Sequence, residues 1–335
     1  MVARELKAGR EACVAKINAD GGVRGRSLVL LTRDDKGDPA VAVDQAETLA
    51  DKDHAVALLG PVGRGVQDAI LRWSSGAGVA VIDPYGGGMA SRVPAFENAF
   101  FLTANYSVEG ERIASHMAEL GIKDVAVVYV ENDQGLESLL ALEEPMSVLG
   151  LHRTWTGTVR RDGADARSRV EALLAAHPQA LVLATTGPAT AALLKALREH
   201  GGPIQLAIPT YGLSSAATEA ELRTLGAEAR GFIMTQVVPS PRDTLVGIVA
   251  MYRSALPTGG EPTYVGLQGC MDVVLLAEAF KRRSGDVNRA STLSLLREAG
   301  KVNLGNFGVD LDPHLKLGSR FTDIVLIDGR GRIVR

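Results

Sequence analysis

The 335-residue chain is poor in cysteine and aromatic residues and has no long apolar run. Phe, Trp and Tyr make up 4% of the residues, and no stretch of eighteen or more apolar residues occurs, so neither a membrane span nor a signal peptide is predicted. The net charge is -3, and Lys and Arg are scattered rather than clustered. This distribution argues against a nucleic-acid partner.

The cysteines and histidines give no sign of a metal site. Cys13 and Cys270 both fall on apolar faces of expected helices, and we predict two buried thiols rather than a disulfide. The six histidines stand at no metal-ligand spacing. No metal and no cofactor are therefore expected.

What the chain does contain is an alternation of strands and helices over most of its length. Such an alternation is typical of parallel sheets covered by helices on both faces, and 335 residues suffice for two such domains. Strands are predicted at 27–31, 55–59, 79–82, 125–130, 153–158, 180–183, 205–208 and 231–237. Helices are predicted at 40–51, 64–75, 108–120, 134–149, 167–176 and 188–200.

The two ends of the chain carry further signals. Leu6, Cys13 and Ile17 mark an opening helix that stops at Gly21 and Gly22. The last third predicts helices at 264–283 and 291–299. It closes with a hairpin whose strands, 321–327 and 332–334, flank the turn sequence Asp-Gly-Arg-Gly.

Three segments carry a resemblance to a known family: INADGGVRGRSLVLLTRDDKGDPAVAV, FFLTANYSVEGERIASHMAELGIKDVAVVYVENDQG and GSRFTDIVLIDGRGRIVR. Together they resemble the leucine/isoleucine/valine-binding class of type I periplasmic solute-binding proteins. The resemblance implies an α/β fold with two Rossmann-like lobes, joined by three crossovers near Asn105, Val238 and Asp310. It places lobe 1 at 1–105 plus 239–312 and lobe 2 at 106–238 plus 313–335.

The resemblance also implies a function and a place in the cell. A small solute would be held in the cleft between the lobes and delivered to an ABC permease in the membrane, which implies a periplasmic location. A sensor of the same fold, like the amide-responsive regulators, is the alternative. An enzyme is not expected, because the chain has no Walker motif, no G-x-G-x-x-G after a first strand and no G-x-S-x-G.

Two glycine-rich loops of lobe 1 are candidate solute contacts, because ligands of open parallel sheets bind beyond the carboxyl ends of the strands. Glycine lets the backbone approach a ligand, and helix amino ends favour a carboxylate. Arg64 could pair with an acid or stand solvated at its helix start. The residues that align with the family's ligand loops are Gly63, Arg64 and Gly65, then Tyr85, Gly86 and Gly87.

Lobe 2 contributes the candidates Tyr106, Gln134, Thr186, Gly187, Tyr211 and Gly212. In amino-acid-binding relatives, an acidic residue that pairs with the ligand ammonium aligns with Tyr211, and tyrosine supplies no such charge. We therefore expect an aromatic or aliphatic acid rather than a zwitterionic amino acid. Tyr85, Tyr106 and Tyr211 would line a slot for it, unless one or more of them is a core or rim residue.

The beginning of the chain departs from the family pattern. In the family a strand precedes the first helix, whereas here only Met1 and Val2 precede Ala3. Lobe 1 is thus expected to lack its first strand, through a misplaced start, a truncated chain or another segment that fills the gap. The two neighbouring strands would then have unpaired backbone groups.

Overall fold

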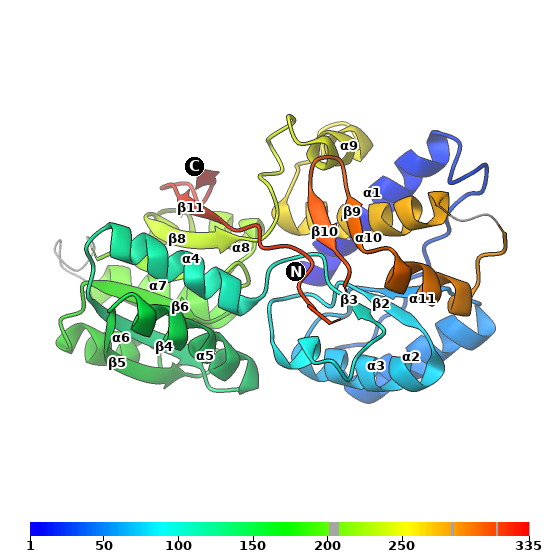
Figure 1. The fold of residues 1–335 in the computed structure, drawn as a ribbon. Coiled ribbons are helices and arrows are strands. Elements are labelled where there is room, and N and C mark those ends of the chain that lie inside the picture. The colour runs from blue at the N-terminus through cyan, green and yellow to red at the C-terminus, as the bar shows by residue number, and fades with distance from the viewer. Residues whose placement is uncertain (201–207, 283–284, 313, 335) are drawn as a thin grey trace. The chain divides into compact units, whose positions relative to one another are not determined.

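The computed structural model describes residues 1–200, 208–282, 285–312 and 314–334, which form two compact units. Unit 1 comprises Met1–Ala104 and Val238–Phe321, and unit 2 comprises Asn105–Val237 and Thr322–Arg335. The chain therefore passes between the units three times (Figure 1). The last change of unit falls at 321–322, later than the 312–313 expected from the sequence.

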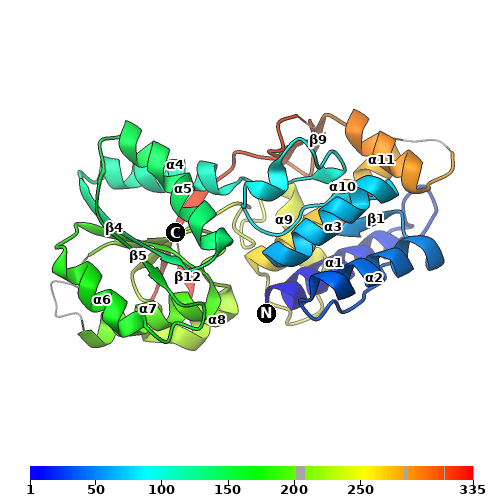
Figure 2. The ribbon, with the colours of Figure 1, turned by 90° about the horizontal axis from the view of Figure 1, so that it is seen from below.

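Unit 1 contains a three-stranded parallel sheet, β1 (Ala57–Leu59), β2 (Ala80–Ile82) and β3 (Ala99–Phe100), in that order. Helices α2 (Pro39–Glu47) and α3 (Arg64–Ala77) share an apolar core with these strands, while α11 (Arg289–Glu298) contacts β1 and β2. Figure 2 shows α2 and α3 side by side. The predicted strands and helices of this region form close to their expected positions.

The opening helix α1 (Val2–Ala19) packs along α10 (Tyr264–Lys281) at very short range. A Cβ on Gly9 would lie 1.9 Å from the carbonyl oxygen of Gly266, so only glycine allows this approach. Cys13 and Cys270 form a disulfide between the two helices, with their Cα atoms 5.4 Å apart. The prediction of two free thiols is wrong, because the apolar helix faces that carry the cysteines pack against each other.

The predicted strand at 27–31 is also wrong. These residues join no sheet of the described chain, and the side chain of Val29 is 80% exposed. The Asn18 side chain donates to the Leu28 carbonyl and accepts from the Leu28 N–H, at 2.8 and 2.7 Å. Among the described strands β1 pairs with β2 alone, and the segment 27–31 does not pair with the other edge of β1.

Unit 2 is a seven-stranded sheet in the order β12-β11-β8-β7-β6-β4-β5. Strands β4 to β8 are parallel to one another, β11 runs antiparallel to β8, and β11 and β12 form the predicted antiparallel hairpin. The strands are β4 (Asp124–Val130), β5 (His152–Val159), β6 (Ala180–Ala184), β7 (Thr210–Gly212), β8 (Phe232–Gln236), β11 (Asp323–Ile327) and β12 (Ile333–Val334).

Helices cover both faces of this sheet, as the alternation predicts. One face packs against α4 (Tyr106–Glu119) and α5 (Asp133–Val148). The other packs against α6 (Ala166–Ala175), α7 (Gly187–His200) and α8 (Glu219–Leu225). The predicted strand at 205–208 lies almost wholly outside the described residues, and the described strand of this region, β7, follows it.

The remaining elements belong mostly to unit 1. They are the π-helical turn η1 (Thr48–Lys52), the 3-10 turns η2 (Ala90–Arg92) and η4 (Gly226–Ala229), helix α9 (Gly247–Ala255), and the antiparallel pair β9 (Lys301–Asn303) and β10 (Gly308–Asp310). Within the described ranges, none of the helices is long and apolar enough to cross a membrane.

Candidate functional site

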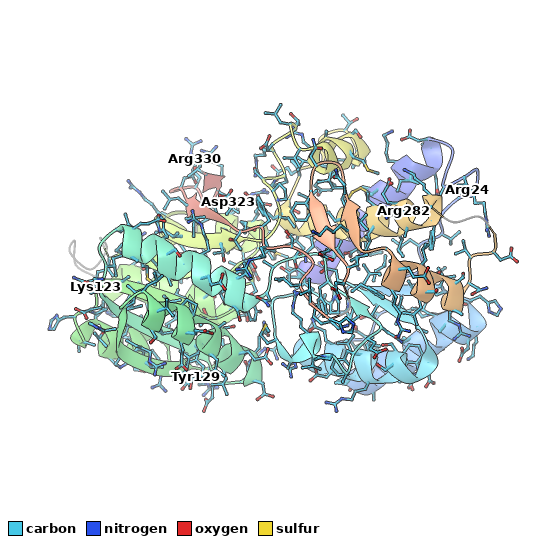
Figure 3. All side chains as sticks on the ribbon, in the orientation of Figure 1. Arg24, Lys123, Tyr129, Arg282, Asp323 and Arg330 are labelled. Carbon is cyan, nitrogen blue, oxygen red and sulfur yellow. A yellow bond between two sulfur atoms is a disulfide. The ribbon has the colours of Figure 1, made fainter. Side chains whose placement is uncertain are left out.

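The carboxyl edge of the unit 2 sheet holds a topological switch point. Strand β4 has β5 on one side and β6 on the other, so the connections after β4 and after β6 leave in opposite directions. Ligands of open α/β sheets bind at such a point. In Figure 3, Lys123 labels the residue just before β4, and Tyr129 lies near the carboxyl end of this strand. The loops at this edge are Glu131–Asn132, which leads into α5, and Thr185–Thr186, which leads into α7.

Two of the predicted residues meet at this edge. Tyr106, the first residue of α4, is 1% exposed, and its hydroxyl accepts a hydrogen bond from Gln134 Nε2 at 3.1 Å. The same hydroxyl donates to Ser215 Oγ at 3.2 Å. Burial raises the pKa of Tyr106, so its hydroxyl stays neutral. The three side chains form a neutral polar cluster at the edge of the sheet.

The start of α7 is tied to the same region. Gly187 N–H donates to the Ala216 carbonyl at 3.0 Å, which joins the loop after β6 to the loop after β7. The Thr185 hydroxyl lies 2.7 Å from that of Thr190 in the interior, whereas Thr186 is half-buried. Thr186 thus supplies a hydroxyl beside the amino end of α7. The Gly187 N–H is already bonded there and Pro188 has no N–H, so this end offers a carboxylate the hydroxyl and the helix dipole.

Tyr211 and Gly212 do not form the loop that the sequence predicts. Both lie within β7, and Tyr211 is 0% exposed with its hydroxyl 3.0 Å from His116 Nδ1. A Cβ on Gly212 would lie 2.5 Å from the Phe232 ring, so packing accounts for this glycine. The placement of these residues in a solute loop is therefore wrong, because the strand extends further than its pattern indicates.

The actual loop after β7 runs from Leu213 to Thr218 and contains residues that the sequence did not suggest as solute contacts. Glu109 of helix α4 fixes the backbone of this loop, because its Oε2 accepts hydrogen bonds from the Ser214 N–H, at 2.7 Å, and from the Thr235 hydroxyl. Glu109 is fully buried, and the loop itself contains no acidic residue. The signal in the sequence for this loop is the serine pair at 214 and 215, which follows β7 after one residue.

The two predicted loops of unit 1 are brought together. Tyr85 N–H donates to the Pro61 carbonyl at 3.1 Å. The side chain of Gln67, buried on α3, donates to the carbonyls of both Pro61 and Tyr85, at 3.1 and 2.6 Å. Gln67 therefore fixes the spacing of the loops after β1 and β2, a role that the sequence did not reveal.

The glycines and the arginine of these loops lie at the start of α3 and after β2. Gly63 is the N-cap of α3, with φ +93° and no side chain to cap the helix. Arg64 Nε pairs with Asp68 Oδ2 at 2.9 Å, which favours the interpretation of Arg64 as a helix-surface arginine. Gly65 is exposed, Gly86 has φ +111° and Gly87 is buried.

A buried charged cluster lies behind the unit 1 loops. Asp83, with φ +45°, accepts from the Leu102 N–H at 2.9 Å and from Gln268 Nε2 at 2.8 Å. The Arg10 guanidinium donates twice to Asp272 Oδ2, at 2.9 and 2.7 Å. Burial raises the pKa of both carboxyl groups. Across the described chain, no group of three or more His, Cys, Asp or Glu is arranged to hold a metal ion.

Comparison with known proteins agrees with this architecture. The family model for periplasmic binding proteins matches residues 1–314. A chemotactic signal transduction system substrate-binding protein, BasB of Halobacterium salinarum, is 23% identical over 304 residues, or 84% of this chain and 72% of BasB.

Solved structures share the fold. An extracellular ligand-binding receptor from Verminephrobacter eiseniae superposes with a TM-score of 0.89 at 24% identity, covering 100% of this chain and 95% of the receptor. An ABC transporter substrate-binding protein from Desulfitobacterium hafniense, in complex with Leu, gives 0.81 at 19% identity, covering 98% and 94% of the two chains. The predicted two-lobed α/β fold is confirmed, and the chain belongs to the periplasmic binding protein family.

Proposed function

We propose that the chain is the solute-binding component of an ABC uptake system and that its solute is a small carboxylic acid without an ammonium group. The observation that carries the proposal is the polar edge of the unit 2 sheet, where Tyr106, Gln134 and Ser215 meet beside the start of α7. The family consists of substrate-binding proteins, and the ABC permease is proposed as the partner.

Neutral donors at the loops favour a carboxylate. Thr186 and the amino end of α7 lie beside the loop that bears Ser215, since Gly187 bonds directly to that loop. In unit 1, the N-cap of α3 is Gly63, which has no side chain to cap the helix and so leaves its first N–H groups for other acceptors. Helix amino ends attract negative charge, and hydroxyl donors fix its orientation.

The absence of an acidic residue from the loop after β7 argues against an ammonium group on the solute. Oε2 of the fully buried Glu109 beneath this loop accepts hydrogen bonds from Ser214 and Thr235. Glu131 and Asp133, after β4, are exposed, where an ion pair contributes little. A buried ammonium without a partner would cost several kcal/mol. The loop after β7, rather than Tyr211, therefore favours a solute without an ammonium group.

Matched pairs of solutes test the proposal by calorimetric titration. L-leucine and 4-methylpentanoate differ only in the ammonium group, as do L-phenylalanine and 3-phenylpropanoate. We expect at least one of the acids to bind, and to bind at least about tenfold more tightly than its amino acid. The alcohol 4-methylpentan-1-ol is the control for the carboxylate and should give no heat of binding. Tighter binding of either amino acid would overturn the proposed ligand class.

Variants at the polar edge locate the binding. Ser215→Ala and Thr186→Val should each weaken binding of the acid by about tenfold, because each removes a hydrogen bond to a charged group. Ser168→Ala, a change at an exposed position of α6 in the same unit, is the control. Unchanged affinity in both edge variants would contradict the proposed site.

The disulfide supports a location outside the cytoplasm. Cys13 and Cys270 are both fully buried, and a structural disulfide persists in an oxidising compartment such as the periplasm. Signalling is the second candidate function, favoured by the relationship to BasB. Co-purification from membranes distinguishes the two: a permease and its ATPase would support uptake, and a chemotaxis receptor would support signalling.

A further inference from the structure

Arg92 is a buried arginine that the proposed function leaves unexplained. It ends the 3-10 turn η2, a few residues after the candidate loop at Tyr85–Gly87, and it is 4% exposed. Its guanidinium carbon lies 4.2 Å from the centre of the Phe101 ring, in cation–π contact. Burial of a guanidinium is costly unless its donors are satisfied, so the positions of its acceptors are informative.

The acceptors are carbonyl oxygens from three separate segments. Arg92 Nη1 donates to Thr103 at 3.2 Å and to Lys316 at 3.0 Å. Arg92 Nη2 lies 3.4 Å from the carbonyl oxygens of both Gly86 and Ala104. Gly86 belongs to the candidate solute loop. Thr103 and Ala104 are the residues with which the chain leaves unit 1 for the first time.

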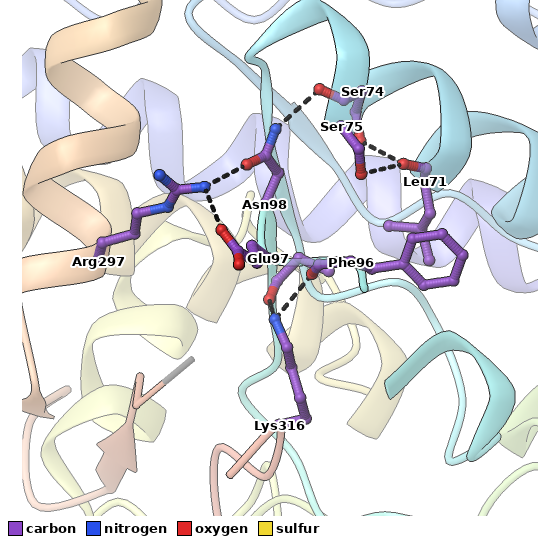
Figure 4. A network of polar contacts seen from close by, with 9 residues as sticks. Leu71, Ser74, Ser75, Phe96, Glu97, Asn98, Arg297 and Lys316 are labelled. Atoms are coloured by element: carbon purple, nitrogen blue, oxygen red, sulfur yellow. Dashed lines mark hydrogen bonds and ion pairs between the residues drawn. The ribbon is translucent and has the colours of Figure 1, made fainter. Parts of the chain in front are cut away.

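The third segment, at Lys316, leads to the last passage between the units, which follows Phe321. A second cation fixes this segment to the rest of unit 1: Lys316 Nζ donates to the carbonyls of Phe96 and Ala99 at 2.7 and 3.2 Å (Figure 4). Gly318 packs so closely that a Cβ would lie 1.9 Å from the Phe101 carbonyl oxygen.

The planar guanidinium is suited to this arrangement. It presents donors in several fixed directions, whereas the lysine ammonium is a compact charge that cannot reach all four carbonyls in the same geometry. The four acceptors are main-chain atoms, so a shift of the loop at Gly86 is resisted at Thr103, Ala104 and Lys316.

We infer that Arg92 is a positioning residue that couples the solute loop at Gly86 to two other segments of unit 1. The chain first leaves the unit through one of them, Thr103–Ala104, and last leaves it through the other, which begins at Lys316. The inference rests on the proposed function for the identity of the loop. A solute that displaces or orders Gly86 would change the hydrogen bonds of the shared guanidinium and thereby the restraint on both passages.

Hydrogen exchange of the full chain without solute tests this coupling. In Arg92→Gln and Arg92→Lys we expect amide exchange to rise by about tenfold together in 84–88, 102–106 and 316–322, while α1 and α10 stay within about twofold of the wild type. Arg297→Gln is the matched control, since Arg297 bonds to Asn98 and Glu97 of the same unit (Figure 4). Its effect should be confined to residues near 97–98.

Three results would overturn the inference: a rise confined to one segment, a uniform rise throughout unit 1, or wild-type exchange in Arg92→Lys. A second measurement adds saturating 4-methylpentanoate as the probe. Protection at 102–106 and 316–322 should change in the wild type and not in Arg92→Lys, and equal changes in both proteins would contradict the coupling. If 4-methylpentanoate does not bind, 3-phenylpropanoate is the probe, and failure of both acids to bind the wild type would count against the proposed ligand class, while the exchange without solute still decides the role of Arg92.

Discussion

The Tyr211 hydroxyl lies 3.0 Å from Nδ1 of His116, joining β7 to helix α4 inside unit 2. The two rings meet edge to face, with centroids 5.7 Å apart. Burial lowers the pKa of His116 and raises that of Tyr211 to about 12, so both groups stay neutral at pH 7. Tyr211 is thus a core residue whose polar end is satisfied within its own unit.

Removing this hydroxyl should affect stability and leave binding unchanged. Tyr211→Phe should lower the free energy of unfolding by about 1 kcal/mol, the net value of one buried hydrogen bond. Urea unfolding measures the loss, and calorimetry with 4-methylpentanoate should give the wild-type affinity. A tenfold loss of affinity with unchanged stability would place Tyr211 back among the solute contacts.

The case of Tyr211 shows what a sequence pattern leaves undetermined. The apolar run at 205–208 locates a strand approximately, but it does not show that Tyr211 lies within β7, paired with Val182. A shift of a few residues along a strand turns a core position into a loop position. The predicted loops at Gly63 and Tyr85, by contrast, are loops in the structure and contact each other.

Gly9 is expected to be irreplaceable for the packing of α1 on α10. Gly9→Ala would place a methyl group 1.9 Å from the Gly266 oxygen, so we expect a loss of about 1–3 kcal/mol or more in the free energy of unfolding. Gly76→Ala, in the exposed part of α3 with open space around it, is the matched control. That change should stabilise the protein by about 0.5–1 kcal/mol. Equal effects of the two changes would contradict the close contact.

The disulfide between Cys13 and Cys270 should contribute substantially to stability. It closes a loop with a sequence separation of 257 residues, and reduction should lower the free energy of unfolding by about 2–4 kcal/mol. Guanidinium unfolding with and without dithiothreitol gives this difference. The double variant Cys13→Ser/Cys270→Ser should unfold identically in both conditions, and a wild type indifferent to the reductant would rule the disulfide out.

Lys316 should make stability depend on alkaline pH. Burial lowers its pKa from 10.5 to about 8, with Glu97 opposing and Arg297 adding to the shift. Between these values the unfolded lysine binds a proton that the folded one has released, so the free energy of unfolding should rise with pH, by at most about 3 kcal/mol.

Urea unfolding from pH 7.5 to 10.5 measures this rise, which should be absent from Lys316→Met. Lys301→Met, at an exposed position of the same unit, is the control and should retain it. An identical pH dependence in the wild type and Lys316→Met would show that the lysine is not perturbed.

The sequence predicts the layers of the fold better than the contacts between distant segments. Strand and helix periodicities give nearly all elements of unit 2, because each depends on neighbouring residues. Whether Cys13 meets Cys270, or which carbonyls surround Arg92, depends on residues far along the chain. For the same reason the apolar segment at 27–31 predicts a sheet strand that does not form, since its sequence does not reveal the lack of a partner.

A crystal structure of the protein with bound 4-methylpentanoate tests the proposed binding site most directly. We predict that the solute carboxylate lies within hydrogen-bonding distance of Ser215 and of Thr186 or the first turn of α7. A solute bound away from the loops after β6 and β7 would contradict the proposed site.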